Sequence, residues 1–390
     1  MKRLISLTLL ITLSLSILAG CGSSPSTTQT PSETTPASTN SPVAAKTTFG
    51  LTPFKDKQVL RLGFFAGSPL SIPFYIADKE GFFKELNIEI KYETFTNGPA
   101  MMEANASWDM AGAGEGGLLV GMLGYGLKVI GISDYEKNLA LLARKDSPLA
   151  KNPTDPNSWK GTTWLYPMGT TAQATLVAGL RKVGLSINDI KSVNMDVASA
   201  LTAFNGGQGD GLAVWNAVAF NAEDKGYIRL GDAGTLGFTA PTGTLATKDA
   251  LTNKRDLVLT SYAVFYYTVE WMNRNNENKA KAVQYYFKNT NDEGIAVTKS
   301  IAERVMKWYA GPTMAQSIKL MTDTSDDAAG LYKTRKLLQA EKDIMVGMDF
   351  FISQKKYTEA DRNKILDNRL VDPTVAQDVK AMLDKLGLKY

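Results

Sequence analysis

Hydrophobic and polar residues alternate in short blocks from residue 58 onwards, and successive blocks change between the periods of strands and helices. Residues 59–64, which are apolar apart from Arg61 and Gly63, are typical of a strand, whereas apolar positions recur with a helical period over residues 73–86. Pro73 fits the first turn of that helix, where no backbone donor is needed. The order of strand, helix and strand predicts a mainly parallel sheet, with ligand contacts in the loops after the strand ends. Further strands are expected at 88–92, 109–112, 127–132 and 139–143, with a loop at 67–69, a turn at 96–99 that leads into a short helix, and a helix at 116–123.

A second set of elements follows the proline- and asparagine-rich stretch at residues 147–158. Its strands and helices alternate like those of the first set, so the pattern predicts two similar α/β lobes. After residue 247 the pattern becomes predominantly helical and amphipathic. The second set has strands at 162–165, 191–195, 212–215 and 227–230 and helices at 170–183 and 197–204, and the helical region has helices at 261–274, 279–287, 301–309, 329–353 and 375–386.

The length and the charge of the chain limit the classes of protein to which it can belong. About 335 residues follow position 55, which is long for one hydrophobic core and suits two lobes. Once Lys2 and Arg3 are set aside, 41 basic side chains stand against 39 acidic ones. Domains that bind nucleic acids usually carry a clustered basic excess. A nucleic acid is therefore not an expected partner.

The sequence contains no histidine. This excludes Ser-His-Asp and Cys-His nucleophile systems and histidine-based zinc sites. Acid or base chemistry by Asp, Glu, Lys or Tyr stays possible, but the chain pairs such groups in no recognisable pattern. We therefore expect no catalytic step, no cofactor and no metal.

Cys21 is the only cysteine, so it has no partner for an internal disulfide. The basic Lys2 and Arg3, the short apolar run at residues 4–18 and small residues before the cut site together indicate a secretory signal. The segment 18–21 resembles the lipobox of bacterial lipoproteins, which implies that Cys21 is lipidated and becomes the first mature residue. The alternative is a buried free cysteine after a chance apolar run. We expect a protein that is anchored by lipid to the extracytoplasmic face of a cell membrane.

Residues 22–46 consist mainly of Ser, Thr, Pro and Ala and contain almost no apolar bulk. Such a segment cannot bury enough surface to offset the entropy of ordering, so it is expected to be a flexible spacer. A glycosylated stalk is the compositional alternative. The predicted divisions are a signal peptide at 1–20 and a lipidated cysteine with its tether at 21–54.

Five segments resemble the solute-binding proteins of the nitrate, sulfonate and taurine type of ABC importer. The most recognisable is residues 73–85, which matches the first helix of that family. The others match an Asp-containing strand with its glycine turn, the entry to the second lobe, an anion-facing helix start, and a strand that ends in a pocket aromatic. These four are residues 109–114, 159–161, 169–171 and 209–215.

The resemblance implies an α/β fold, a two-lobed periplasmic-binding-protein-like (type II) clamshell with a helical C-terminal region. It places lobe one at 55–143 plus 244–390 and lobe two at 144–243, with crossings near 143–145 and 240–244. A solute would bind in the cleft and close the lobes like a hinge. The implied partners are a small-molecule solute, an ABC permease and its ATPase, and the protein itself would be a monomer.

The start of the helix expected near residue 170 has the features of an anion site. Unpaired backbone N–H groups and hydroxyls there can hold an anionic oxygen, although Thr170 could instead serve only as an N-cap. Trp215 ends a predicted strand, where it could stack on a ligand or belong to the core. The expected ligand-binding residues are Ser68, Asn97, Gly98, Glu115, Gly169, Thr170, Thr171, Trp215 and Asn216.

Acidic residues in the expected cleft argue against a bare anion as the solute. Glu115 lies in a loop expected to face the cleft, and Asp134 and Glu136 follow the fourth strand. They would favour a solute with an amine, such as a zwitterion whose acid end contacts Thr170 and whose amine contacts Glu115. In the alternative they are solvated loop charges. Asn216 stands close to where the resembling family often has a proline, and it could supply a polar contact.

These observations indicate the extracytoplasmic solute-binding subunit of an ABC importer, which binds a small polar organic solute similar to a sulfonate, nitrate or taurine. One alternative is a receptor for pyrimidines or amines, and another is a sensor subunit. A third is an enzyme similar to the thiamin-pyrimidine synthases, although those enzymes rely on cysteine and histidine features that this chain lacks.

Overall fold

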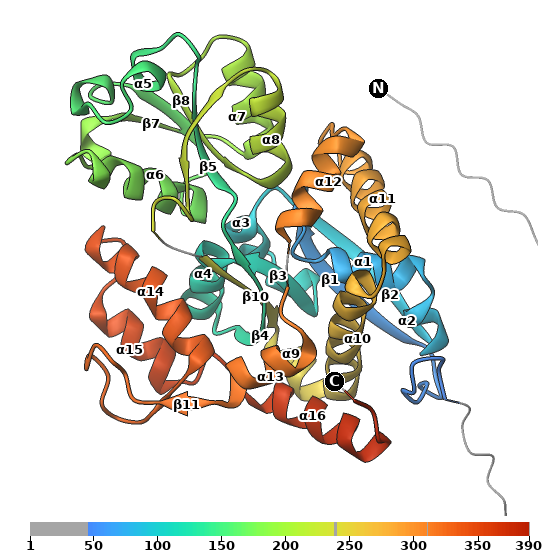
Figure 1. Ribbon diagram of the computed structural model, residues 1–390. Helices are drawn as coiled ribbons and strands as arrows, with labels where there is room; N and C mark the ends of the chain where they lie inside the picture. Colours follow the sequence, from blue (N-terminus) through green and yellow to red (C-terminus); the bar gives the residue numbers. More distant parts are fainter. Residues whose placement is uncertain (1–45, 238–239, 310, 390) are drawn as a thin grey trace, which may run out of the picture. The chain divides into compact units, whose positions relative to one another are not determined.

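The computed structural model describes residues 46–237, 240–309 and 311–389 (Figure 1). The predicted signal peptide, the lipidated Cys21 and most of the tether lie outside the described residues and stay predictions. No helix in the described part of the chain is long and apolar enough to cross a membrane.

The first lobe is built on a five-stranded sheet of order β2-β1-β3-β10-β4. Four of its strands run parallel, and β10 lies antiparallel between β3 and β4. Every residue of β10 is buried, as expected for a strand in the middle of a covered sheet. The strands are β1 (Gln58–Phe65), β2 (Ile88–Phe95), β3 (Met110–Gly114), β4 (Lys128–Glu136) and β10 (Ala240–Ala246).

The second lobe repeats this scheme in a sheet of order β7-β6-β8-β5-β9. Here β5 is the antiparallel strand and lies between β8 and β9. The strands are β5 (Leu139–Ala143), β6 (Thr163–Tyr166), β7 (Lys191–Asn194), β8 (Gly211–Trp215) and β9 (Ile228–Asp232), and a separate pair is formed by β11 (Thr324–Ser325) and β12 (Leu337–Leu338).

Helices cover both sheets, and the C-terminal third of the described chain is mainly helical (Figure 1). The two-lobed α/β fold with a helical C-terminal region is therefore confirmed. In the first lobe the helices are α1 (Ile72–Lys79), α2 (Phe82–Glu85), α3 (Gly98–Glu103) and α4 (Glu115–Tyr125), and in the second lobe α5 (Pro148–Lys151), α6 (Thr171–Lys182), α7 (Val197–Asn205) and α8 (Asn216–Asp224). The C-terminal helices are α9 (Lys248–Asn253), α10 (Arg255–Asn273), α11 (Asn276–Asp292), α12 (Lys299–Trp308), α13 (Met314–Thr322), α14 (Gln339–Ser353), α15 (Glu359–Asp367) and α16 (Thr374–Leu386).

Two predicted helices are shorter in the structure than the sequence pattern suggested. The helix expected at 73–86 breaks into α1 and α2 at Gly81, which has a φ of 86° that side chains disfavour. The helix expected at 329–353 begins only at Gln339, because the residues before it form turns and the short strand β12. In both cases the backbone leaves the helical conformation although the spacing of apolar residues continues.

The crossings between the lobes lie earlier than predicted. The run at 139–143 was expected to close lobe one, but it forms β5 and pairs with β8 and β9 of the second sheet. The chain therefore crosses at residues 137–138, and it has returned to the first sheet when β10 begins at Ala240. An apolar strand can be read from its composition, but the sheet that it joins depends on partners distant in the sequence.

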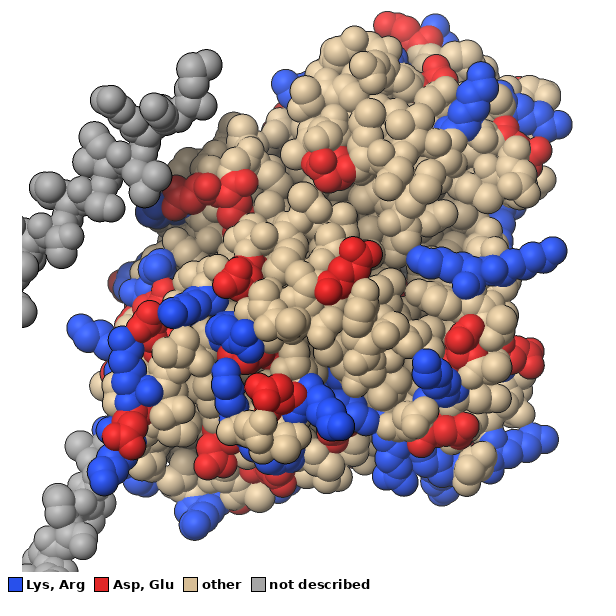
Figure 2. Space-filling view, turned by 180° about the vertical axis from the view of Figure 1, so that it is seen from behind, with Lys and Arg blue, Asp and Glu red and all other residues tan. Residues whose placement is uncertain are grey.

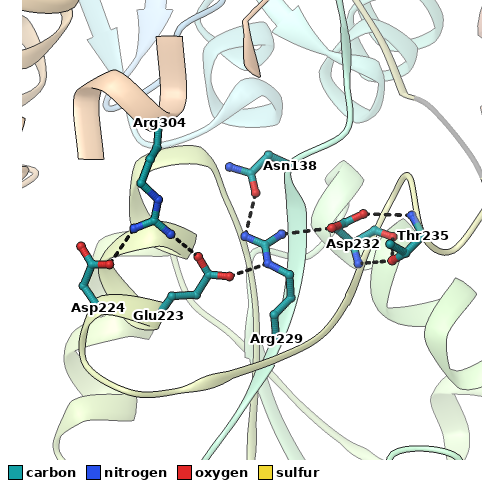
Figure 3. A network of polar contacts seen from close by, with 7 residues as sticks. All are labelled: Asn138, Glu223, Asp224, Arg229, Asp232, Thr235 and Arg304. Atoms are coloured by element: carbon teal, nitrogen blue, oxygen red, sulfur yellow. Dashed lines mark hydrogen bonds and ion pairs between the residues drawn. The ribbon is translucent and has the colours of Figure 1, made fainter. Parts of the chain in front are cut away.

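The two lobes contact each other along both flanks of the cleft. On one flank Arg304 of α12 forms ion pairs with Glu223 (2.5 Å) and Asp224 (2.6 Å) of α8 (Figure 3). The same Glu223 accepts a hydrogen bond from Arg229, which extends the network into the second sheet. On the other flank Arg181 of α6 donates to Ser353 Oγ at the end of α14 (2.5 Å). The structure is thus a clamshell whose edges are in contact.

Candidate functional site

A small cavity lies between the lobes, where the parallel strands of both sheets end. Its walls include the last residues of four strands, namely Phe65, Gly114, Glu136 and Trp215. Loops and helix starts after parallel strands are the usual ligand position in α/β sheets. The cavity volume that the centre of a water molecule can occupy is about 20 Å³, so the lobes leave little free space between them at this point. The remaining lining residues are Gly98, Pro99, Gly116, Gly117, Thr170 and Thr171.

Helix starts from both lobes supply backbone donors to this cavity. Gly116 and Gly117 open α4, and Thr170 and Thr171 open α6. The first N–H groups of a helix have no partner within it, and the positive end of the helix favours negative charge. The Thr170 hydroxyl donates to the carbonyl of Pro167 (2.7 Å) and does not cap the helix. These backbone amides can therefore bind oxygen atoms of a solute.

Trp215 contributes a further donor. Its side chain is 5% exposed, and its Nε1 has no hydrogen-bond partner among the described residues. Phe65 of the other lobe packs edge-on against the indole ring, with 5.9 Å between the ring centroids. A buried donor without a partner costs about 1–3 kcal/mol, and an acceptor atom on a solute would remove that cost. The Trp215 N–H is thus the most specific indication of what binds here.

Glu136 faces the same cavity from the end of β4 and is 7% exposed. Burial and the neighbouring Asp134 raise the pKa of the Glu136 carboxyl to about 8, although a hydrogen bond from Asn216 Nδ2 (2.8 Å) opposes the shift. Asn216 has a φ of 46°, a strained geometry that asparagine tolerates better than most residues. With a pKa of about 8, the Glu136 carboxyl is largely protonated at neutral pH.

The free energy of unfolding is expected to decrease as the pH rises from 4.5 to 8. Replacing Glu136 by glutamine should make this decrease smaller. Between pH 4.5 and pH 8 the folded protein holds a proton on Glu136 that the unfolded chain has lost, so the free energy of unfolding decreases as pH rises. Burial also raises the pKa of Glu293, to about 7, so the slope should shrink without vanishing. Urea unfolding across this range measures the slope. Glu103→Gln, the same change at an exposed acid, should leave the slope as it is.

The structure brings four of the nine predicted ligand residues together around the cavity, Gly98, Thr170, Thr171 and Trp215. Asn216 stands behind them and contacts Glu136, and Gly169 precedes the start of α6. The other residues do not line the cavity. Asn97 caps α3 by accepting from the Ala100 N–H (3.0 Å), and the Ser68 hydroxyl accepts from the Leu70 N–H (3.3 Å).

The predicted place of Glu115 in this cleft is wrong. Glu115 is the first residue of α4, and its side chain points away from the cavity toward Gly347 of α14, where it lines a different hollow. The direction of a side chain at a helix start follows from the rotation of the helix, which the sequence does not specify. Asp134 and Glu136 are each 7% exposed, so the alternative that treated them as solvated charges does not hold.

Several cavity residues were not predicted. Phe65 and Gly114 end β1 and β3, one and two residues beyond the predicted strand ends at 64 and 112, so the rule that ligands lie at such ends pointed close to them. Gly117 and Pro99 sit one position beyond a predicted helix start and had no signal of their own. Outside the cavity lining, Lys356 in the turn after α14 lies close to Gly169: its Nζ is 3.2 Å from the position that a Cβ on Gly169 would take. No pattern indicated that this distant lysine reaches the second lobe.

Comparisons with known proteins agree with this architecture. A candidate binding protein of Brucella abortus (strain 2308) is 26% identical over 142 residues, which cover 36% of this chain and 42% of that relative. The match therefore spans less than half the length of the curated relatives. The alkanesulfonate-binding protein SsuA of Xanthomonas axonopodis pv. citri, bound to MOPS, aligns with a TM-score of 0.60 and 19% identity over 78% of this chain and 95% of its own.

The periplasmic nitrate-binding protein NrtA of Synechocystis PCC 6803 aligns with a TM-score of 0.63 and 12% identity, over 84% of this chain and 89% of its own. Identities this low show that the fold is shared. A sequence profile of the family described as NMT1/THI5 like matches residues 68–275, which is more than half of the chain. The chain therefore belongs to the NMT1/THI5 like family and has the two-lobed fold of periplasmic binding proteins.

Proposed function

We propose that the protein is the solute-binding subunit of an ABC importer, which binds a small polar organic solute between its lobes and delivers it to a permease and its ATPase without a chemical step. The unpartnered N–H of Trp215 in a cavity between the lobes carries this proposal. The sulfonate- and nitrate-binding proteins of similar fold support it. Basic and acidic side chains are interspersed over the face seen in Figure 2, as suits a protein that does not bind nucleic acid.

The solute is proposed to carry an oxygen-rich group such as a sulfonate. Backbone amides at the starts of α4 and α6 and the Trp215 N–H converge on the cavity, and none of the described residues that line it is a lysine or an arginine. Neutral donors of this kind bind an anion without a counter-charge, as helix starts do elsewhere. A protonated Glu136 adds another donor at neutral pH.

A receptor for a solute with an amine or a ring nitrogen, such as a pyrimidine, is the second candidate. The observation that favours it is the buried carboxyl of Glu136 in the cavity wall, which would accept a hydrogen bond from such a group. A zwitterion in this cavity would place its amine at Glu136, because Glu115 does not line the cavity.

The lipid anchor belongs to the same proposal. Cys21 and the tether would hold the protein on the extracytoplasmic face of the membrane as a monomer, close to the permease. Retention of the purified protein in a detergent phase, and its loss from that phase in Cys21→Ser, would test the anchor.

Thermal shift of the purified protein against a panel of solutes tests the binding function. The panel contains sulfonates, nitrate, zwitterionic amino acids, polyamines and pyrimidines. A ligand at about one hundred times its dissociation constant stabilises by roughly 2.7 kcal/mol, which raises the melting temperature visibly. A hit among the sulfonates or nitrate supports the first candidate, whereas hits only among amines or pyrimidines support the second. No shift with any member would contradict both.

Replacing Gly116 by alanine is expected to weaken solute binding at least about tenfold, a loss of roughly 1.4 kcal/mol. A Cβ at this position would collide with the carbonyl of Gly169 and lie 2.9 Å from the Thr170 Cα, so the lobes could not approach as closely as they do. Titration of the best solute from the panel measures the loss. Gly124→Ala is the matched control, since it lies on the same helix and its Cβ would meet no described atom within 4 Å. Equal affinity in the two variants would show that this approach of the lobes is not needed.

A further inference from the structure

A second, larger hollow lies beside the first cavity, on the other side of the start of α4. Its volume is about 380 Å³, measured in the same way as that of the first cavity, and it is bounded by α4, α6 and α14. Glu115 forms part of its wall, whereas Gly116 and Gly117 face the first cavity. The other lining residues are Ala174, Ala178, Arg181, Lys182, Leu236, Val346, Gly347 and Phe350.

Glu115 is an isolated polar group in this hollow. Its side chain is 2% exposed, and its Oε1 has no hydrogen-bond partner in the described part of the chain. Burial raises the pKa of its carboxyl well above the ordinary value, which a contact with the Gly347 backbone amide only partly opposes. Within the described residues no lysine or arginine pairs with it. A cationic amine placed here would donate a hydrogen bond to the carboxyl and favour its ionised form, which burial alone disfavours.

The edge of the hollow carries positive charge. Arg181 and Lys182, on the last turn of α6, form no ion pair with any acidic residue of the described chain. Arg181 uses one guanidinium nitrogen for Ser353 Oγ and lies over the ring of Phe350, 5.2 Å from its centroid. Lys182 donates to the carbonyl of Thr235 (2.6 Å). A guanidinium has five N–H donors, so Arg181 can still bind an anionic group.

The wall between these two ends is apolar. Ala174 and Ala178 lie four residues apart on α6 and so share a face with Arg181. Their small side chains leave open the space across from Phe350. Glu115 contacts α14 at Gly347 and Arg181 contacts it at Ser353, and six residues of helix span about 9 Å. A molecule that reached both ends would need a chain of about that length.

We propose that this hollow is a second ligand site, which takes small organic acids whose apolar body ends in an amine, with the acid at Arg181 and Lys182 and the amine at Glu115. The site is separate from the cavity that contains Trp215, so it does not depend on the function proposed for that cavity. Because α6 belongs to the second lobe and α4 and α14 pack with the first, a bound molecule contacts both lobes.

The test is calorimetric titration of the purified protein with 6-aminohexanoate, whose acid and amine are joined by a chain of methylene groups. Hexanoate and hexylamine each lack one of the two ends. We expect 6-aminohexanoate to bind at least about tenfold more tightly than either, as charge-assisted hydrogen bonds at two ends predict. Glu115→Gln should lower its affinity to that of hexanoate and leave hexanoate unchanged.

Three further variants distinguish binding in this hollow from binding elsewhere on the protein. Ala178→Trp fills the hollow and should abolish binding of all three probes, while Lys182→Gln should weaken the two acids alone. Trp215→Phe should bind 6-aminohexanoate like the parent protein, whatever it does to the solute of the first cavity. Circular dichroism confirms that each variant is folded. Equal affinity for 6-aminohexanoate in the parent protein and Glu115→Gln, or no binding of any probe to the parent protein, would overturn the proposal.

Discussion

Replacing Trp215 by phenylalanine is expected to weaken solute binding by about tenfold to a hundredfold, because the change removes the indole N–H and keeps an aromatic wall. The Nε1 of Trp215 is buried in the cavity between the lobes without a partner among the described residues. A hydrogen bond from such a donor to a charged oxygen contributes about 1.5–3 kcal/mol. Calorimetric titration with the solute that the thermal panel identifies measures the loss.

Trp308→Phe is the matched control for this prediction. Trp308 is 43% exposed on α12 and packs edge-on against Phe220, outside the cavity. The same chemical change there should leave the affinity within error of the parent protein. If Trp215→Phe bound the solute as tightly as the Trp308 variant, the Trp215 N–H would not contact the solute, and our assignment of the cavity would lose its main support.

Replacing Asp109 by asparagine is expected to lower the free energy of unfolding by about 2–3 kcal/mol, the largest effect on stability that we anticipate outside the apolar core. The Asp109 side chain is fully buried and accepts hydrogen bonds from the Arg61 N–H (2.9 Å), the Arg61 guanidinium (2.7 Å) and Lys254 Nζ (2.9 Å). It thereby joins β1, the start of β3 and the region before α10. An asparagine would present the NH₂ group of its amide to donors that need an acceptor. Urea denaturation measures the loss.

The effect of Asp109 should also depend on pH. Burial raises the pKa of this carboxyl, but the hydrogen bonds from Arg61 and Lys254 outweigh burial and hold the pKa below its ordinary value. The carboxylate therefore stabilises the fold above the unfolded pKa, and this contribution is lost as the pH falls through the lower, folded pKa. Asp109→Asn should cost less stability in acid than at neutral pH. Asp249→Asn, at an exposed acid in the first turn of α9, is the control: Asp249 acts on Arg61 only through space, so the change should cost less stability than Asp109→Asn at neutral pH.

The sequence was sufficient for the fold class and for most of the strands that end at the cavity. Apolar runs such as 59–64 and 212–215 have the composition of buried strands, and both are strands in the structure. The sequence did not reveal β10, whose residues 240–246 include a proline and a glycine and show no clear period. Its place between β3 and β4 is set by long-range pairing, which a local pattern does not contain.

The site was harder to predict than the fold. Thr170 and Trp215 were found because each occupies a position with a local signature, a helix start or a strand end. Glu115 was predicted to contact the solute, but the structure places Glu136 in the wall of the cavity and Glu115 in the wall of a different hollow. Both are acids near the ends of elements in the same lobe, so only the rotation of each element in three dimensions distinguishes them. Lys356 lies close to Gly169 because the turn after α14 packs near the start of α6. No local sequence pattern indicates this contact.

The position of β10 in the chain sets an order in which the two lobes can form during synthesis. All five strands of the second sheet come from the continuous segment 139–232, whereas the first sheet needs β10, which follows that segment. Non-local strand pairing forms slowly because a long loop must close first. The second lobe can therefore fold as a unit before β10 is available to join β3 and β4 of the first sheet. During that interval the edges of β3 and β4 that later pair with β10 are open, and an open strand edge can pair with another chain.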